Sequence, residues 1–416
     1  MRIEGFRSRA TDRGTRTEAI VAWEDAPRRP AELFFEVSGA GALDAADANA
    51  FVAAVAVPAI RNGERRISVA GSVCPRLRDG VAAAAGLFRA WYRVPFPAPV
   101  VEPDGGFVAP RARSPRLAGI FASGGVDSSF SIRRNRRDLP PGHPRSYRRA
   151  IRVRDLAFPF DAAPERKSHI EARSSRAVSA VAAAADLDVT EIATNAAGVE
   201  PEFEVFNRWT HGSVLAAAGL AADGALTDVT VSASHDVRSG VRSWGSHPIL
   251  DPLFGTAARE IHHEGIESTR MEKVAEIARW PAALEVLYVC TGGPFESDAM
   301  NCGICEKCVR TRVSLLVAGV EAPPTFPAGR VSAAEIDAIA PSAASRRPDY
   351  YWGELVGATR TAGEAGIAAA IGRMIERQRR VDAWNAELGW KGSLRRMDRK
   401  WLGGALLSAR RRWAPR

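Results

Sequence analysis

A glycine-rich turn after an apolar run is the part of the sequence best suited to bind an anion. The run Leu117–Ala122 predicts a short buried strand, and the turn reads Ser123-Gly124-Gly125-Val126-Asp127-Ser128-Ser129. Glycine leaves no side chain between the backbone and a ligand, and it tolerates positive φ angles. Several N–H groups can then converge on one anion beside the positive end of the following helix. The turn therefore predicts a phosphate-binding loop.

The side chains of this loop indicate metal-bridged ATP. The carboxylate of Asp127 would be repelled by a polyphosphate unless Mg²⁺ lay between them. Ser123 and Ser128 would donate hydrogen bonds to phosphate oxygens. The loop has neither the lysine of G-x-x-x-x-G-K-[ST] nor the spacing of G-x-G-x-x-G. The alternative is a turn of small residues that only joins a strand to a helix.

A cysteine cluster is the second grouping with clear chemistry. Four of the five cysteines lie within residues 290–308, at Cys290, Cys302, Cys305 and Cys308. Two-residue spacings bring sulfur atoms onto one turn, and in a cytoplasmic chain clustered thiols favour a metal over disulfides. Four thiolates predict a closed structural Zn²⁺ site. An iron–sulfur cluster and an unmetallated redox or sulfur-carrying pair are the alternatives.

Two further segments carry candidate catalytic residues. Thr269-Arg-Met-Glu272 matches a capping box, which places Arg270 and Lys273 on one face near a helix start. Two cations there could stabilise a departing pyrophosphate, although an ordinary helix with exposed ion pairs has the same pattern. His247, in a turn-rich loop, could accept a proton from an attacking amine, or it could simply be an exposed loop histidine. His262-His263 lacks the H-E-x-x-H spacing.

Strand and helix patterns alternate from Leu117 onward. Such alternation predicts a parallel sheet with helices on both faces, and ligands bind beyond the carboxyl ends of its strands. Residues that follow the expected strand ends should line that rim: Ser123, Asp161, Asn195 and Ser232–Asp236. The predicted fold is α/β: a doubly wound parallel sheet over residues 115–285, a small α+β domain over 1–113, a four-cysteine zinc segment over 286–322, and a helical basic region over 323–416.

The composition is that of an ordinary globular protein, with 46% hydrophobic and 25% charged residues in a chain of 416. The absence of a long apolar stretch and of a secretory leader predicts a cytoplasmic protein without a transmembrane helix. The net charge is +9, and only five of the 57 basic residues are lysine. Basic residues cluster in two places, residues 133–154 and the region after residue 373. In the C-terminal region, helices are expected over Arg360–Leu388 and Ser393–Trp413. The two clusters suggest nucleic-acid binding as an alternative. The basic tail could also lie on an anionic membrane surface, or it could be a solvated helix packed on its own domain.

The loop Ser123–Ser128 resembles the pyrophosphate loop of the PP-loop ATP pyrophosphatases, which are adenine nucleotide alpha-hydrolase-like proteins. With the four cysteines, the region from about residue 115 to 320 is similar to the 7-cyano-7-deazaguanine synthase branch of queuosine biosynthesis. That resemblance implies ATP cleavage between the α and β phosphates, an adenylated carboxylate, and its conversion with ammonia to an amide and then a nitrile. The matching positions are those of the loop for ATP and the four cysteines for zinc.

The chain also departs from that branch. It has additional N-terminal and basic C-terminal regions, and eleven residues separate Cys290 from Cys302. The predicted function is an ATP-dependent C–N ligase-like enzyme that acts on a small-molecule or protein carboxylate. A PP-loop tRNA-modifying enzyme and a non-catalytic nucleotide-binding partner module are the alternatives.

Overall fold

Two compact units make up the chain, Met1–Asn301 and Cys302–Arg416. The computed structural model describes residues 1–39, 46–111, 114–154, 156, 163–222, 224–239, 242–290, 299–327, 329–341, 348–386 and 397–398. Within the described residues, no helix is both long enough and apolar enough to cross a membrane.

The described residues of the first unit form a ten-stranded sheet in the order β10-β9-β6-β7-β8-β3-β2-β1-β4-β5. The strands are β1 Arg2–Ala10, β2 Gly14–Ala22, β3 Ala31–Gly39, β4 Arg66–Val69, β5 Val100–Pro103, β6 Ala118–Phe121, β7 Tyr147–Arg154, β8 Asp188–Thr194, β9 Asp228–Ser232 and β10 Glu260–Glu264. Neighbours from β10 to β8 run parallel, as do the pairs of β4 with β1 and β5. The predicted α/β class with a mostly parallel sheet is therefore confirmed.

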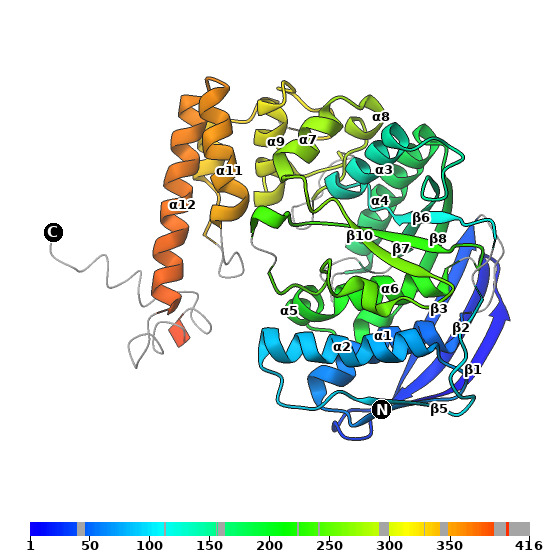
Figure 1. Ribbon diagram of the computed structural model, residues 1–416. Coiled ribbons are helices and arrows are strands. Elements are labelled where there is room, and N and C mark those ends of the chain that lie inside the picture. Colours follow the sequence, from blue (N-terminus) through cyan, green and yellow to red (C-terminus); the bar gives the residue numbers. More distant parts are fainter. Residues whose placement is uncertain are drawn as a thin grey trace. The chain divides into compact units, whose positions relative to one another are not determined.

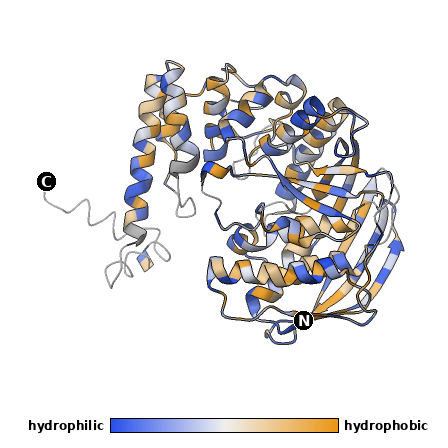
Figure 2. Cartoon of the chain, viewed as in Figure 1, coloured by the Kyte–Doolittle hydropathy of each residue, from blue (hydrophilic) through white to orange (hydrophobic). Residues whose placement is uncertain are grey.

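Helices cover both faces of this sheet (Figure 1). One group comprises α3 Val126–Asp138, α4 Pro164–Ala184, α7 Arg270–Ala278 and α8 Pro281–Leu284. The other comprises α1 Ala48–Asn62, α2 Pro75–Tyr92, the short α5 Phe203–Val205 and α6 His211–Ala221. In Figure 2 the apolar colour follows the inner strands and the helices packed on them, where the core lies.

Strand β6 lies at the point where the strand order reverses. Its neighbours are β7, the next strand in the chain, and β9, which follows β8. Numbered from β6, the five parallel strands thus have the order 5-4-1-2-3. In open α/β sheets, ligands bind outside the carboxyl ends of the strands at such a switch point. The glycine-rich loop directly follows β6, so the topology places it at this position.

The N-terminal strands continue the same sheet. β3 pairs antiparallel with β8, with Phe35 opposite Thr194 and Gly39 opposite Thr190. Helix α1 packs against α6, and every residue from Ala48 to Ile60 is buried. The compact unit Met1–Asn301 thus contains both these N-terminal elements and the parallel strands. Pairing with β3 also satisfies the edge of β8, which would otherwise present unpaired backbone groups.

The second unit is helical, with α9 Glu306–Val317, α10 Ala333–Asp337, α11 Pro348–Thr361 and α12 Ala365–Ala386. The expected single helix over Arg360–Leu388 is wrong in its bounds, because Gly363 adopts φ +80° between α11 and α12. The carboxylate of Asp337 accepts hydrogen bonds from Arg373 and Arg377 at 3.1 Å each, which joins α10 to α12. Of the expected tail helix Ser393–Trp413, all but residues 397–398 lie outside the described residues.

Candidate functional site

The glycine-rich loop forms the predicted strand–turn–helix junction. β6 ends at Phe121, and Gly125 is the N-cap of α3, which begins at Val126. Gly124 has φ +73°, and a Cβ atom on it would lie 2.2 Å from the Cβ of Ala177 in α4. Both the left-handed backbone and this close approach require glycine at position 124. The first N–H groups of α3 have no acceptor within the helix and therefore face the mouth of the loop.

Two serine hydroxyls fasten this turn. The Oγ of Ser123 accepts the N–H of Gly125 at 3.3 Å, and Ser128 Oγ donates to the carbonyl of Gly125 at 3.3 Å. The two hydroxyl oxygens are 3.4 Å apart. Ser123 is exposed at the loop, whereas Ser128, Val126 and Ser129 are buried. Ser129 is therefore directed into the protein and Ser123 toward solvent.

The start of α7 brings two cations to Asp127, a residue far away in the sequence. Nη1 of Arg270 donates to Oδ2 of Asp127 at 2.7 Å, and Nζ of Lys273 lies 3.6 Å from Oδ1. Lys273 also donates to the carbonyl of Ala233 at 2.6 Å, just beyond β9. Burial lowers the pKa of the Lys273 ammonium, an effect that the charge of Asp127 opposes. The loop and its two cations are thus assembled in one place.

The capping box that positions these cations is confirmed. Oγ1 of Thr269 accepts the N–H of Glu272 at 3.2 Å, and the Glu272 carboxylate accepts the N–H of Thr269 at 2.7 Å. This reciprocal pair fixes the first turn of α7. Arg270 and Lys273 consequently leave the helix at its first turn and on one side, facing α3.

Three of the rim residues expected after β9, Ser234, His235 and Asp236, line a small cavity next to this constellation. It is lined by His211, Ser234, His235, Asp236, Trp244, Ser246, His247 and His263, among others. Burial lowers the pKa of His235 to about 4, and the charge of Asp127 acts against that shift. By contrast, the side chain of Asn195 binds β3, donating to the carbonyl of Glu32 at 2.7 Å. Asp161, the other expected rim residue, lies outside the described residues.

His247 is buried, with only 3% of the residue exposed. The ring nitrogen Nδ1 of His247 accepts the backbone N–H of Ile249 at 3.1 Å. The backbone N–H of His247 donates to Oδ1 of Asp251 at 3.0 Å. The imidazole ring also packs on Trp91, with ring centroids 4.8 Å apart. These contacts hold the loop, and they occupy the ring nitrogen Nδ1.

Sequence reasoning missed the contact between this loop region and His263 on β10. The Nδ1 of His263, on β10, lies 2.8 Å from Oδ2 of Asp251, whose side chain is fully buried. The Ser246 hydroxyl donates to the same oxygen at 2.6 Å. Asp251 and His263 are twelve residues apart and on different elements, so no spacing rule links them.

The four cysteines form the predicted cluster. Their sulfur atoms lie within 4.8 Å of one another, and Sγ of Cys302 and Cys308 are 3.7 Å apart. Gly303 has φ +76°, and the N–H of Cys305, the N-cap of α9, points at Sγ of Cys302 at 3.4 Å. This set could bind a metal such as zinc, because four thiolates suit tetrahedral coordination. The segment before Cys290 is not a strand: the short helix α8 ends at Leu284, and residues 285–290 contain no strand.

A second group of possible ligands, Asp228, Glu260 and His262, is an ion-pair network. Their ligand atoms lie within 4.8 Å of one another. However, Nε of Arg116 donates to Asp228 at 3.0 Å, and Nε2 of His262 lies 3.0 Å from the same carboxylate. Although burial acts in the opposite direction, these contacts hold the pKa of Asp228 below its usual range.

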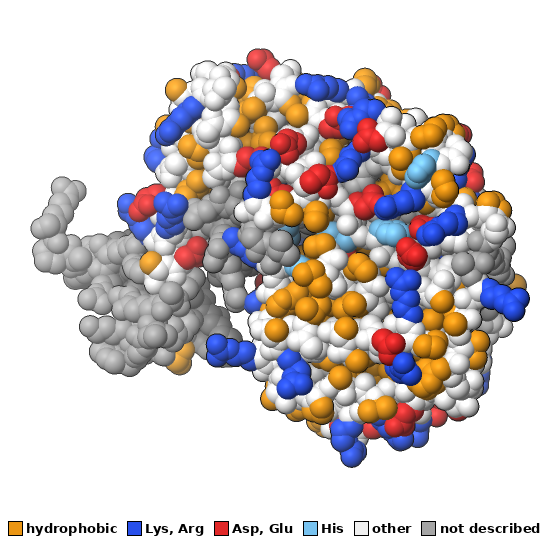
Figure 3. Space-filling view, viewed as in Figure 1, with side chains coloured by type: hydrophobic (Ala, Val, Ile, Leu, Met, Phe, Trp, Pro, Cys, Tyr) orange, Lys and Arg blue, Asp and Glu red, His pale blue; other side chains and the backbone are white. Residues whose placement is uncertain are grey.

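The basic stretch over residues 133–154 is largely neutralised by carboxylates. Arg133 lies 2.8 Å from Glu276, and the other pairs are Arg134 with Glu267, Arg136 with Asp186, Arg137 with Asp138, Arg145 with Glu264, Arg149 with Asp188, and Arg152 with Glu191. On the face shown in Figure 3, basic and acidic side chains are interspersed accordingly. A phosphate backbone is attracted by a continuous basic surface, which this stretch does not provide.

Searches of protein-family models, curated proteins and solved structures found no match to this chain.

Proposed function

We propose that this protein is an ATP-dependent adenylating enzyme that releases AMP and pyrophosphate and joins a nitrogen nucleophile to an activated carboxylate or carbonyl carbon. One observation carries the proposal. The glycine-rich loop stands at the switch point of a parallel sheet, with Asp127, Arg270 and Lys273 gathered beside it. The similarity of the loop and the cysteine cluster to the PP-loop family and its 7-cyano-7-deazaguanine synthase branch agrees with this chemistry.

The loop side supplies phosphate binding. Backbone N–H groups at the start of α3 and the hydroxyl of Ser123 would donate to phosphate oxygens, next to the positive end of the helix dipole. Mg²⁺ is usually held by one or two carboxylates together with substrate phosphates. Asp127 fits that role as a partly exposed carboxylate in the first turn of α3. When bound, the ion would neutralise charge on the phosphates.

Arg270 and Lys273 serve the leaving group. A substrate carboxylate oxygen attacks the α phosphorus, the bond to the bridging oxygen breaks, and pyrophosphate leaves with that electron pair. The two cations offset the charge that develops on pyrophosphate, and they are already oriented by Asp127 and the capping box. A nitrogen nucleophile then attacks the acyl carbon, and AMP departs.

The cysteine cluster has a structural part in this proposal. Cys290, Cys302, Cys305 and Cys308 would hold Zn²⁺, which when bound supplies a fixed tetrahedral centre. No disulfide joins cysteines in the part of the chain that the structure describes. Because such thiols persist in a reducing compartment, we place the reaction in the cytoplasm.

The test uses 7-carboxy-7-deazaguanine as the carboxylate, ammonium chloride as the nitrogen source, and ATP with MgCl₂. Chromatography measures AMP, and a coupled assay measures pyrophosphate. We expect Asp127→Asn and Arg270→Gln each to lower pyrophosphate release at least about 100-fold. Asp138→Asn, at the far end of α3, is the matched control and should change it less than about threefold.

Unchanged pyrophosphate release in Asp127→Asn would contradict the assignment. A binding measurement covers the case in which this carboxylate is not the substrate. Wild-type protein should bind a non-cleavable ATP analogue in the presence of MgCl₂, and Gly124→Val should not. Absence of binding by the wild type would overturn the proposed function itself.

A further inference from the structure

We propose that His263 is the catalytic base that accepts the proton of the attacking nitrogen nucleophile, with Asp251 and Ser246 as its positioning residues. The nucleophile is ammonia or a primary amine. This inference rests on the proposed function and deepens it by assigning its second half-reaction to named atoms.

The contacts of Asp251 determine which nitrogen of His263 can act. A carboxylate only accepts hydrogen bonds, so Nδ1 of His263, 2.8 Å from Oδ2 of Asp251, must carry a proton. In the neutral ring Nε2 is then the acceptor. Asp251 is itself fixed by the Ser246 hydroxyl at 2.6 Å and by the N–H of His247 at 3.0 Å. The ring is thus held in one tautomer and one orientation.

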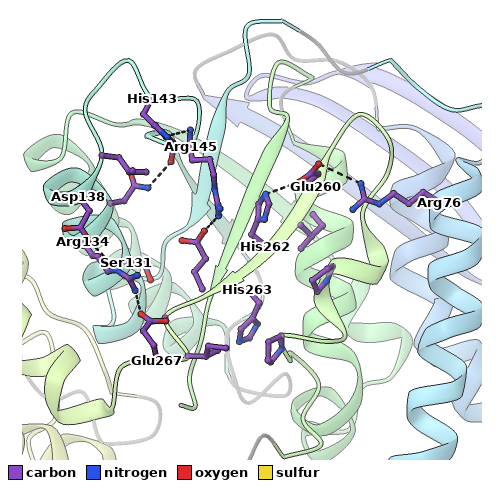
Figure 4. A pocket seen from close by; sticks show the side chains of 18 residues that line it. Arg76, Ser131, Arg134, Asp138, His143, Arg145, Glu260, His262, His263 and Glu267 are labelled. Carbon is purple, nitrogen blue, oxygen red and sulfur yellow. Dashed lines mark hydrogen bonds and ion pairs between the residues drawn. The ribbon is translucent and has the colours of Figure 1, made fainter. Parts of the chain in front are cut away.

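The Nε2 atom of His263 is available for a substrate. Within the described residues it has no hydrogen-bond partner, and it is not among the fully buried polar atoms. The residue lines two cavities, the small one next to His235 and Asp236, and a larger one of about 690 Å³ along β10. Figure 4 shows His263 and His262 directed differently from β10, with His262 turned toward Glu260.

The position of His263 connects it to the nucleotide loop. It lies at the carboxyl end of β10, where the carbonyl of the next residue, Glu264, accepts the N–H of Ala233 at 2.8 Å. A Cβ on Gly265 would lie 3.6 Å from Nζ of Lys273, which contacts Asp127. Charge interactions also link Asp236, in the same small cavity as His263, to Lys273. A carboxylate adenylated at the loop would therefore face this cavity.

The neighbouring histidines are less suited to the role. Nδ1 of His247 accepts the N–H of Ile249, and Nδ1 of His211 lies 2.9 Å from the carbonyl of Asn207. Burial lowers the pKa of His211, and it lowers the pKa of His235 to about 4, which weakens both as bases. Nε2 of His262 is engaged with Asp228 at 3.0 Å.

The proposed step balances without a further reactant. Ammonium gives a proton to Nε2 of His263, and the lone pair that this frees forms the bond from nitrogen to the acyl carbon. A second N–H proton passes to solvent as the amide forms. The bond between the acyl carbon and the AMP oxygen breaks, and AMP leaves with that electron pair. The proton on His263 then passes to solvent, which returns the base to its starting state.

The test compares two nucleophiles after the same adenylation step. Wild type and His263→Gln are given ATP, MgCl₂ and 7-carboxy-7-deazaguanine, with ammonium chloride or with hydroxylamine. Ammonium must lose a proton before it attacks, whereas hydroxylamine is largely unprotonated at neutral pH. We expect His263→Gln to lower ammonia-dependent amide formation at least about 100-fold. Hydroxamate formation should fall less than about tenfold.

The neighbouring residue provides the matched control. His262 lies on the same strand as His263 but does not line the cavity next to His235. We therefore expect His262→Gln to change both reactions less than about threefold. Equal loss with both nucleophiles in His263→Gln, or no loss with ammonia, would overturn the role of His263. Failure of the wild type to bind the non-cleavable ATP analogue would instead overturn the proposed function, and the step assigned to His263 with it.

Discussion

Replacing Gly124 by alanine tests whether the loop geometry is as tight as the structure indicates. The residue has φ +73°, and the new methyl group would lie 2.2 Å from the Cβ of Ala177 in α4. The next nearest atom, Cα of Ala177, is at 3.4 Å. The steric overlap therefore involves one atom of the facing helix, the Cβ of Ala177.

Two costs add in this variant. A non-glycine residue in the left-handed region costs about 1–2 kcal/mol, and overpacking a well-packed contact costs about 1–3 kcal/mol. We expect Gly124→Ala to lower the free energy of unfolding by about 2–5 kcal/mol. That is a large part of the total stability of a typical protein, about 5–15 kcal/mol.

A second substitution separates the two costs. Ala177→Gly removes the methyl group that the new side chain meets, so in the double variant only the backbone strain and about 1 kcal/mol for glycine within a helix remain. The double variant should therefore be no less stable than Gly124→Ala alone, and more stable where the steric cost exceeds 1 kcal/mol. The coupling free energy between the two sites should be about 1–3 kcal/mol.

Urea unfolding followed by circular dichroism measures all four proteins of this cycle. Gly86→Ala, in α2, is the control, because a Cβ there meets no atom within 4 Å. It should raise stability by up to about 1 kcal/mol. A loss below 1 kcal/mol in Gly124→Ala, or a coupling energy near zero, would refute the steric argument for this loop.

Three further predictions concern the histidines, the cysteines and the buried carboxylate. The pKa of His235 is lowered from 6.5 to about 4, so between these pH values the unfolded chain binds a proton that the folded chain does not. Stability should therefore fall as the pH is lowered through this range, and His235→Gln should remove about 3 kcal/mol of that dependence; equal pH profiles in urea unfolding would contradict this. Cys305→Ala should lose bound metal in elemental analysis and Cys74→Ala should keep it, and finding iron with sulfide would replace zinc by an iron–sulfur cluster. Asp251→Asn should destabilise the fold by about 2–3 kcal/mol, since an amide group cannot accept three hydrogen bonds as the carboxylate does; an unchanged midpoint of urea unfolding would show that these bonds contribute little.

Helix α1 and strand β3 show why part of the fold could not be predicted from sequence. Ala48–Ile60 is buried on all sides, so the apolar residues of α1 have no helical periodicity to detect. The pairing of β3 with β8 joins residues about 150 positions apart, and no local pattern encodes such a partner. The strands and helices from residue 117 onward were easier to predict, because they alternate and have clear turn residues between them.

By itself the sequence determined the groupings that depend on short spacing. The loop from Ser123 to Ser128, the capping box at Thr269 and the Cys302-x-x-Cys305-x-x-Cys308 turn all form as predicted, because backbone conformation and nearby side chains define them. Tertiary structure alone decided that His263, and not His247, presents an available nitrogen to a cavity. That outcome depends on where Asp251 is buried, and burial is set by the packing of elements distant in the sequence.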